Sequence, residues 1–305
     1  MDKIKKLFHY IFHRPDLLGI AILTRIAPIF PDRLYLKMLF RLSMGYKLNL
    51  DNPQTFSEKL QWLKLYNRKP EYTMMVDKYA VKEYVAGIIG EEYIIPTLGV
   101  WDKFEEIDFD KLPNRFVLKT THGGGNTGVV ICKDKAIFDI EAAKKKLNRS
   151  LRSDIYTNFR EWPYKNVKRR IIAEEYIADS NGESNDYKFF CFNGEVKVML
   201  MATERQTGVK FDYFDKDFNH LPFEQGGPNS EKVLSKPSCM DEMVKLASIL
   251  SQNIPLVRVD LYDIDGKIYF GELTFFDSSG MAKFEPETWD HIFGSWIKLP
   301  KKTVR

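Results

Sequence analysis

The chain has 305 residues, of which 44% are hydrophobic and 29% charged, and its formal net charge is +4 at pH 7. This length is sufficient for a sizeable core and for two or three subdomains, and the composition is that of a soluble globular protein. The mild basic excess does not indicate nucleic acid as a partner, which requires Lys and Arg clustered on one element. An anionic ligand or a membrane surface is compatible with it.

The cysteines Cys132, Cys191 and Cys239 lie far apart and include no CxxC pair. Their spacing disfavours a zinc site and a disulfide scaffold, and it fits a reducing cytosol. No secretory signal is evident. We therefore expect a cytoplasmic protein.

Residues 1–72 are predicted to form a helical N-terminal region. The opening stretch MDKIKKLFHYIFHRP places Lys3, Lys5 and Lys6 beside apolar residues, a pattern typical of a basic amphipathic helix on an anionic membrane face. The solvated face of a packed helix is the simpler explanation. Peripheral contact with the inner face of the membrane is therefore a second expectation.

Two further patterns predict helices within this region. Residues 17–30 contain Arg25 and Pro28 and are too short to span a bilayer, so we expect a buried helix there. The stretch TFSEKLQWLKLYN follows a capping-box pattern, with Thr55 three residues before Glu58. A third helix is expected in DKYAVKEYVAGIIG, at residues 77–90.

From residue 116 onward the sequence predicts mainly strands, in which apolar and polar residues alternate. It also predicts one helix at about 139–152 and another near 240–250. The dipeptides Asn193-Gly194 and Asp265-Gly266 each separate two such runs and predict hairpin turns. The pattern indicates an α+β fold with antiparallel hairpins. It lacks the βαβ alternation of a doubly wound sheet.

The stretch FVLKTTHGGGNTGVV at residues 116–130 joins a strand lysine to a loop with four glycines. Three structures fit it. The glycines form a hairpin turn, an oxyanion hole as in hydrolases with an HGGG run, or a loop of bare N–H groups over a polyphosphate beside Lys119. The loop lacks the GK[ST] ending of a Walker A motif, and no GxSxG nucleophile elbow follows.

The last predicted hairpin carries two carboxylates on its two arms. Asp260 lies five residues before Asp265 and Glu272 lies six after Gly266, so the two acids are close to facing partners in apolar runs. Burying them together requires a compensating cation, and oxygen ligands of this kind suit Mg²⁺. Arg258 shares a face with Asp260 by strand periodicity. The alternative is that both acids point outward into solvent.

These features together fit a nucleoside triphosphate. Its phosphates need N–H donors and lysines, Mg²⁺ screens the phosphate oxygens, and the base needs hydrogen-bond partners. The run IIAEEYI at residues 171–177 offers those partners at the end of a β-branched strand.

The order of VDKYAVK, FVLKTTHGGGNTGVV, IIAEEYI, DYKFFCFNG and VRVDLYDIDGKIYFGELTF resembles the ATP-grasp superfamily, over about residues 76–281. More narrowly, the chain resembles the branch named for teichuronopeptide biosynthesis (TupA-like), found in bacterial surface-polysaccharide gene clusters. The resemblance implies antiparallel sheets and helices that form two lobes around ATP. It divides the chain into 1–72 and an ATP-grasp domain at 73–305, with a glycine-loop lobe at about 114–175 and a metal-site lobe at about 176–305.

The resemblance also implies roles for individual residues. Lysines would contact the nucleotide, the glycine loop would cover the β- and γ-phosphates, and the segment after the β-branched strand would hold adenine, with either glutamate at the amino group. The implied ATP-binding residues are Lys78, Lys119, His122, Gly123, Gly124, Gly125, Gly128, Glu174, Glu175, Tyr176, Ile177 and Lys188. An exposed helix lysine at 78 and a surface strand lysine at 188 are the plain alternatives.

For the chemistry, the resemblance implies Mg²⁺ ligands at Asp260 and Glu272, with Thr274 where many relatives have Asn. Arg258, together with Lys119 and Lys188, would be catalytic, and Arg258 would stabilise an oxyanion. The loop residues Ser278, Ser279 and Gly280 fall where relatives bind substrate, although a plain turn gives the same pattern.

The implied reaction is ATP-dependent ligation of a carboxylate and an amine through an acyl phosphate. The expected partners are an amino acid and a carboxylate on a sugar or polysaccharide precursor. The alternative is a metal- and nucleotide-sugar-dependent glycosyltransferase of the same pathway, since Asp215-Lys216-Asp217 and Asp263-Ile264-Asp265 formally match a DxD triplet. A non-catalytic nucleotide-binding protein is the third hypothesis.

Overall fold

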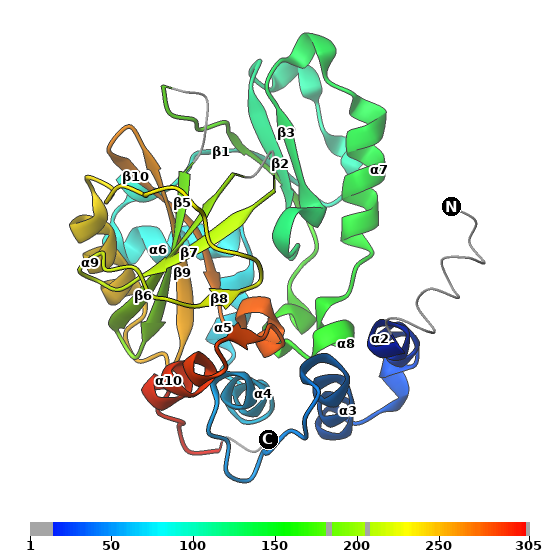
Figure 1. Ribbon diagram of the computed structural model, residues 1–305. Helices are drawn as coiled ribbons and strands as arrows, with labels where there is room; N and C mark the ends of the chain where they lie inside the picture. The colour runs from blue at the N-terminus through cyan, green and yellow to red at the C-terminus, as the bar shows by residue number, and fades with distance from the viewer. Residues whose placement is uncertain (1–14, 181–184, 205–207, 303–305) are drawn as a thin grey trace.

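The computed structural model describes residues 15–180, 185–204 and 208–302 (Figure 1). This part of the chain contains a group of helices and three antiparallel sheets: a larger sheet of five strands, a smaller sheet of four and a pair of two short strands. The predicted α+β class is confirmed. No helix of the described segments has the length and apolarity needed to cross a membrane.

The smaller sheet has four antiparallel strands in the order β1-β4-β2-β3. Strand β2 lies between β4 and β3, with Lys119 opposite Ile172 on one side and Val129 on the other. Helix α7 (Ile140–Leu151) packs on β2 and β3, and the side chain of Asp139 caps it by accepting from the Ala142 N–H. The strands are β1 (Thr97–Trp101), β2 (Phe116–Thr120), β3 (Val129–Cys132) and β4 (Ile171–Glu175).

The larger sheet has five antiparallel strands in the order β10-β9-β5-β6-β7. Both predicted hairpins are present, and both residues of each turn adopt positive φ: 53° and 89° at Asn193-Gly194, and 53° and 85° at Asp265-Gly266. The strands are β5 (Asn185–Phe192), β6 (Glu195–Thr203), β7 (Lys210–Phe214), β9 (Val257–Ile264) and β10 (Lys267–Thr274).

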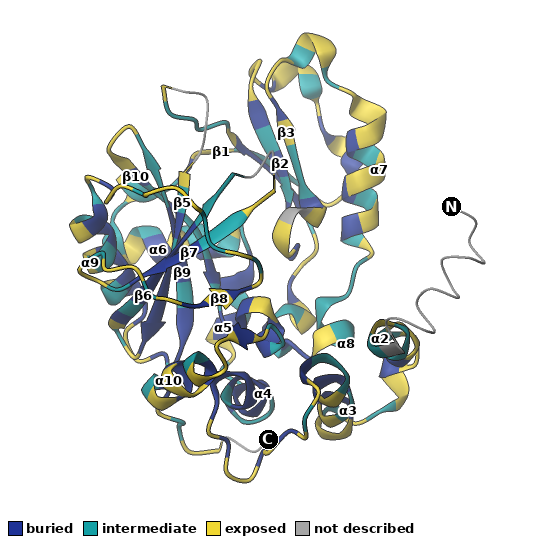
Figure 2. Cartoon of the chain, viewed as in Figure 1, coloured by how far each residue is buried: buried dark blue, intermediate teal, exposed yellow. Residues whose placement is uncertain are grey.

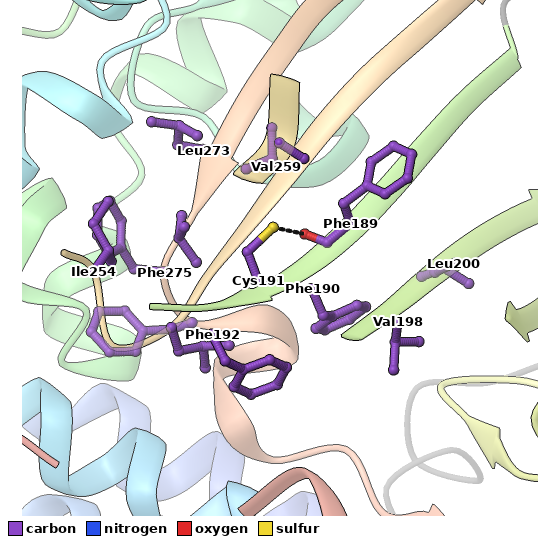
Figure 3. Close-up of a cluster of buried hydrophobic side chains, with 14 of the residues drawn as sticks. Phe189, Phe190, Cys191, Phe192, Val198, Leu200, Ile254, Val259, Leu273 and Phe275 are labelled. Carbon is purple, nitrogen blue, oxygen red and sulfur yellow. Dashed lines mark hydrogen bonds between the residues drawn. The ribbon is translucent and has the colours of Figure 1, made fainter. Parts of the chain in front are cut away.

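The larger sheet is covered on both faces around the second half of β5, where Phe189–Phe192 form a continuous apolar run. Figure 3 shows Phe189, Phe190, Cys191 and Phe192 among the buried side chains of this core. Helix α9 (Met240–Leu250) packs against β5, β6 and β9. The ring of Phe293 lies 5.8 Å from Phe190. All four side chains of the run are therefore buried, whichever face of the sheet they point to.

A bulge interrupts the pairing of β10 with β9. Phe270 pairs with Leu261, but the next paired residue, Glu272, lies opposite Asp260, so that Gly271 is the extra residue. A Cβ atom at Gly271 would stand 2.9 Å from the Asp260 carbonyl oxygen. The predicted facing of Asp260 and Glu272 is thus confirmed, and it depends on this irregularity.

The described part of the N-terminal region, residues 15–72, is helical; α4 and one side of α3 pack on the larger sheet's core, whereas α2 packs on α3. Helix α4 has the predicted capping box, in which Thr55 and Glu58 satisfy each other's backbone N–H groups. Asp290 of α10 accepts from the Ser57 N–H at 2.8 Å and joins α4 to the C-terminal helix. The helices are α2 (Pro15–Arg25), α3 (Asp32–Met44), α4 (Phe56–Tyr66), α5 (Glu71–Val76), α6 (Ala80–Ile89) and α10 (Thr288–Trp296).

Short elements connect these layers. Figure 2 shows that α4 is largely buried, whereas α7 presents one exposed face. The short elements are α8 (Ile155–Phe159), η1 (Ala27–Ile29), η2 (Glu91–Tyr93), η3 (Phe104–Glu106), η4 (Phe109–Lys111), η5 (Gly125–Gly128), η6 (Lys135–Ile137), η7 (Trp162–Asn166), η8 (Asp277–Gly280), β8 (Glu224–Gln225) and β11 (Phe284–Glu285).

One prediction about this region is wrong. The apolar stretch at 17–30 is not a buried helix, because α2 ends at Arg25 and only Leu23 and Ala27 are buried. Ile22 and Ile29 expose 53% and 75% of their surface. High apolar content predicted burial, but the other described residues contact only one side of the helix. The domain boundaries given above remain predictions.

Candidate active site

Lys119 and Glu174 form a buried ion pair at the centre of the smaller sheet. The Lys119 Nζ lies 2.5 Å from one Glu174 carboxylate oxygen, and the Nζ of Lys82 on α6 lies 2.5 Å from the other. Burial alone would lower the pKa of Lys119, but the attraction of Glu174 outweighs it and raises the pKa above its ordinary value. Burial raises the pKa of Glu174, yet the two lysines hold it below the usual range. The pairing therefore favours the charged forms of both Lys119 and Glu174.

The structure distinguishes the two predicted hinge glutamates. Glu174 is buried and points toward Lys119, whereas Glu175 is exposed at the end of β4. The Tyr176 ring lies 4.2 Å from the guanidinium of Arg115, and Ile177 is half-buried. Of the two acids, only Glu174 belongs to a buried charge cluster.

Arg258 is the centre of a second cluster, contributed by β5, β9, β10 and the loop that follows. Its guanidinium donates to both Asp260 carboxylate oxygens, each at 2.7 Å, which is the bidentate geometry that favours Arg. It also donates to Glu272 at 3.2 Å and Thr274 at 3.1 Å. We call the following set the Arg258 cluster: Arg258, Asp260, Glu272, Thr274, Lys78, Lys188, Asp186 and Asp277.

Two lysines neutralise the carboxylates of this cluster. Lys188 donates to Asp260 at 2.7 Å and to Asp186, and Lys78 donates to Glu272. Burial by itself raises the pKa of Glu272, but Lys78 and Arg258 outweigh it and hold the pKa well below its usual range. Burial likewise opposes the charge on Lys188, whose pKa is nonetheless raised by Asp260. Glu272 keeps 33% of its side chain exposed, so the cluster opens to solvent at this point.

The donor chemistry of Asp260, Glu272 and Thr274 fits Mg²⁺. Asp260 and Glu272 are paired residues on adjacent strands, and the Thr274 hydroxyl donates to Glu272 at 3.2 Å. Two carboxylates and a hydroxyl are hard oxygen ligands, and Mg²⁺ typically takes only one or two carboxylates together with phosphate oxygens and water. Within the described segments no group of three or more His, Cys, Asp and Glu residues is arranged to hold a metal. Further Mg²⁺ ligands would therefore have to come from a bound phosphate or from water.

The glycine loop contains two kinds of glycine. A Cβ atom at Gly123 or Gly128 would stand 2.4 or 2.1 Å from the Thr120 hydroxyl, so packing requires both. Gly125 adopts a φ of +56° with open space around it, and Gly124 is exposed. Gly124 and Gly125 have no side chains, so no side chain of their own covers their backbone N–H groups.

His122 does not join the glycines at the surface. Its ring is buried, with Nε2 3.1 Å from the Ser150 carbonyl oxygen, and burial lowers its pKa. The imidazole thus packs toward α7 from the β2 end of the loop.

The predicted substrate loop is held mainly by the N-terminal region. Ser278 and Ser279 adopt positive φ values of 47° and 56°, which are costly for residues other than glycine. Ser279 is buried and accepts from the Lys64 ammonium at its carbonyl oxygen (2.9 Å) and its hydroxyl (2.6 Å). Gln61 donates to the Gly280 carbonyl oxygen at 3.1 Å. Only Ser278 of the three predicted residues is exposed.

Both DxD triplets serve as turns. Asp215 accepts from the backbone N–H groups of Asp217 and Asn219, and Asp263 accepts from that of Gly266. These contacts explain the acidic triplets without a metal, and they give no support to the glycosyltransferase alternative.

A family model for TupA-like ATP-grasp proteins matches residues 58–298, which is most of the chain. The chain belongs to the TupA-like ATP-grasp family. This confirms the resemblance that was inferred from the motif order, and with it the predicted ATP-grasp fold. The match begins at Glu58 in α4 and so includes part of the helical N-terminal region.

This ATP-grasp chain is similar to several solved structures at 20% identity or less. D-alanine–D-alanine ligase from Bacillus anthracis is 20% identical, over 66% of this chain and 57% of its own, with a TM-score of 0.37. D-alanine–D-alanine ligase from Helicobacter pylori is 15% identical over 80% of this chain and 69% of its own, with a TM-score of 0.41. N5-carboxyaminoimidazole synthase from Aspergillus clavatus is 11% identical over 67% of this chain and 45% of its own, with a TM-score of 0.38.

The chain thus spans little more than half the length of the Bacillus anthracis structures it matches, at 57% and 54%. No curated protein sequence matches it. The family model therefore carries the assignment.

Four charged residues of this ATP-grasp site were missed at the level of sequence: Lys82, Asp186, Asp277 and Lys64. A signal existed for Lys82, which ends the DKYAVK stretch four residues after Lys78. Asp277 opens the predicted substrate loop, but nothing in the sequence pairs it with Arg258.

Proposed function

We propose that this TupA-like ATP-grasp protein is an ATP-dependent ligase that joins a carboxylate to an amine. One observation carries the proposal: Lys78 joins the smaller and the larger sheet. Its backbone N–H donates to the Thr121 carbonyl oxygen just after β2 at 2.9 Å, and its ammonium donates to Glu272 on β10. A nucleotide between the sheets would meet Lys119 on one side and the Arg258 cluster on the other.

The nucleotide would exchange partners with groups that are already paired. Lys119, Lys78 and Lys188 each hold a carboxylate, and a triphosphate is a stronger competitor for an ammonium because it carries more charge. Gly124 and Gly125 would place backbone N–H groups over the β- and γ-phosphates. Adenine would lie along the end of β4, against the residues from Glu174 to Ile177.

Asp260 and Glu272 would hold Mg²⁺, with Thr274 beside them. When bound, Mg²⁺ screens the negative charge of the phosphate oxygens during transfer. Asp260 is fixed by two hydrogen bonds from Arg258, so its carboxylate is oriented before any ligand arrives.

The reaction has two steps. An oxygen of the substrate carboxylate attacks the γ-phosphorus, the bond from that phosphorus to the bridging oxygen breaks, and ADP leaves. The amine nitrogen then attacks the carbonyl carbon of the acyl phosphate and gives up a proton to solvent as phosphate departs. Arg258 would stabilise the oxyanion between these two events, and the glycine loop would exclude water from the acyl phosphate.

The proposed substrates are an amino acid and an acidic sugar, or a peptide-like branch, on a bacterial surface polysaccharide or its precursor. Membership of the TupA-like family supports this choice. We place the enzyme in the cytoplasm, with contact to the inner face of the membrane through Lys3, Lys5 and Lys6, which lie outside the described residues.

Thermal unfolding with MgATP, MgADP and several UDP-sugars, each with and without EDTA, tests the proposal. A ligand that binds only the folded state raises the midpoint as its occupancy rises. We expect stabilisation by MgATP and MgADP that EDTA reduces, and none by UDP-sugars. Stabilisation by a UDP-sugar without an effect of ATP would favour the glycosyltransferase instead. ADP release is then screened over pairs of carboxylates and amines.

A further inference from the structure

An apolar groove of about 620 Å³ lies between α2 and α3, on the N-terminal helices. Apolar side chains form its walls, while three basic residues stand at its edge: Lys37, Arg41 and Lys47, all exposed. The walls comprise Ile22, Leu23, Ile26, Met38, Leu42 and Leu48. None of the residues proposed for ligation lines this groove.

The surface around the groove is unusually apolar. Fifteen large hydrophobic residues of the described segments are exposed, and five of these lie within residues 17–34, namely Leu17, Ile22, Ile26, Ile29 and Leu34. Single exposed apolar residues need no explanation, but a contiguous group beside a groove marks an interaction surface.

The same segment is basic. Residues 15–50 contain five arginines and lysines but only two acids, Asp16 and Asp32. Asp32 forms ion pairs with Arg68 at 2.7 Å and Arg160 at 2.9 Å, so its negative charge does not offset the positive charge at the groove. Apolar side chains rimmed by unopposed basic ones match the boundary between lipid headgroups and acyl chains.

We propose that the α2–α3 face docks on the surface of an anionic phospholipid bilayer. Ile22, Ile26 and Ile29 enter the acyl-chain boundary, and Lys37, Arg41 and Lys47 contact the headgroups. This site is distinct from the contact predicted for the basic N-terminus, and it does not depend on the proposed ligase activity.

The docking face is rigidly attached to the ATP-grasp region. Arg160, which precedes η7, reaches back to donate to the Ala27 carbonyl oxygen at 2.6 Å, and it pairs with Asp32. Tyr35 donates to the Asn158 carbonyl oxygen at 2.8 Å. Docking of α2 and α3 would therefore fix the orientation of the whole domain relative to the membrane.

Charge disfavours two other occupants of the groove. The segment 1–14 contains Lys3, Lys5, Lys6 and Arg14 against one acid, Asp2, so it would bring positive charge to a positive rim. A second copy of the chain, meeting face to face, would do the same. An anionic bilayer would attract both the basic rim of the groove and the basic segment 1–14.

Vesicle co-sedimentation of the full chain tests the proposal. The vesicles are phosphatidylcholine alone, or phosphatidylcholine with about one third phosphatidylglycerol. We expect binding to the anionic vesicles only. Lys37→Gln combined with Arg41→Gln and Lys47→Gln should weaken binding about a hundredfold, because each basic residue at such a surface contributes roughly a fivefold factor.

Matched controls separate this site from net charge and from exposed apolar surface in general. Lys145→Gln with Lys146→Gln and Arg149→Gln removes the same charge from exposed positions on α7 and should leave binding unchanged. Ile22→Ser with Ile26→Ser should weaken binding about tenfold or more. Ile131→Ser with Ile137→Ser, at exposed positions elsewhere, should not.

Three results would overturn the proposal. The first is no binding to anionic vesicles. The second is binding that survives both groove variants and is lost only when Lys3, Lys5 and Lys6 are replaced. The third is a dimer in light scattering that Ile22→Ser with Ile26→Ser dissociates, since a second copy then covers the face. MgATP stabilisation of each variant, measured in parallel, reports on the ligase proposal separately.

Discussion

Two buried charge clusters lie on either side of the η8 loop, and they differ in how completely the protein satisfies them. In the Lys64 cluster, formed by Lys64, Gln61, Glu161 and Ser279, the ammonium is fully buried and its three protons meet three acceptors at 2.6–3.1 Å. In the Arg258 cluster the charges are equally well paired, but Glu272 remains one-third exposed and Lys188 remains 17% exposed.

The difference separates a structural buried charge from a ligand-binding one. Each proton of the Lys64 ammonium already has an acceptor and the side chain is not exposed to solvent, so the role of Lys64 is to hold the η8 loop. In the Arg258 cluster, Lys78 and Arg258 both pair with Glu272, whose carboxylate solvent or a ligand can reach. Removing a charge should therefore damage folding in the first cluster and function in the second.

Asp260→Asn should give the largest functional effect. The amide keeps the size of the side chain but removes the charge that we assign to Mg²⁺ binding, and ADP release should fall by about 10²- to 10³-fold. Asp290→Asn is the control, because Asp290 is also a buried carboxylate but bonds only within the helical region. Equal turnover of Asp260→Asn and the unmodified chain would refute the metal assignment.

Lys64→Met should give the largest loss of stability. It leaves acceptor oxygens of Gln61 and Ser279 buried without their donor, and it removes the charge that opposes the effect of burial on Glu161, so the free energy of unfolding should fall by about 3 kcal/mol. Urea unfolding measures this. Lys59→Met, on the same helix, removes only part-buried bonds to the carbonyl oxygens of Gly294 and Ile297 and should cost about 1 kcal/mol. If both variants lose the same free energy, the distinction between the clusters fails.

Lys119→Met should show the opposite pattern to Lys64→Met. Glu174 keeps Lys82 as a partner, so stability should fall by only about 1 kcal/mol. MgATP affinity, followed by titration calorimetry, should weaken about tenfold because a charge-assisted bond to phosphate is lost. An unchanged MgATP affinity would remove Lys119 from the proposed site.

A smaller effect should appear in the pH dependence of stability. Burial lowers the pKa of Lys64 from 10.5 to about 8, against the opposing effect of Glu161. Between those values the unfolded chain binds more protons than the folded one, so stability rises with pH. The free energy by which the unmodified chain exceeds Lys64→Met should therefore grow from pH 8 to pH 10. A difference that is constant or shrinks over this range would contradict the assignment.

Local signals predicted much of the fold. Both hairpins follow from an Asx-Gly dipeptide between two strands, and the cap of α4 follows from Thr55 and Glu58, because the interacting groups are near one another in sequence. The order of five motifs led to the correct family. These are cases in which the sequence itself brings the partners together.

Contacts between distant segments could not be predicted. Lys64 and Ser279 are 215 positions apart, and nothing near either residue announces the other. The two hinge glutamates are adjacent and chemically identical, so only the direction of β4 separates buried Glu174 from exposed Glu175. The exposure of α2 depends on which surfaces the rest of the chain leaves uncovered. The roles of the site residues stay predictions until the variants are measured.

The bulge at Gly271 decides which side of the sheet receives the second carboxylate. In an unbroken strand, Phe270 and Glu272 would point to the same side, and Glu272 would enter the core beside Val259. The inserted glycine reverses the alternation, so that Phe270 and Leu273 are buried while Glu272 joins Asp260. A regular ladder that paired Gly271 with Asp260 would preserve every charged group of the Arg258 cluster and still dismantle it, because the acid would be moved through the sheet to its opposite side.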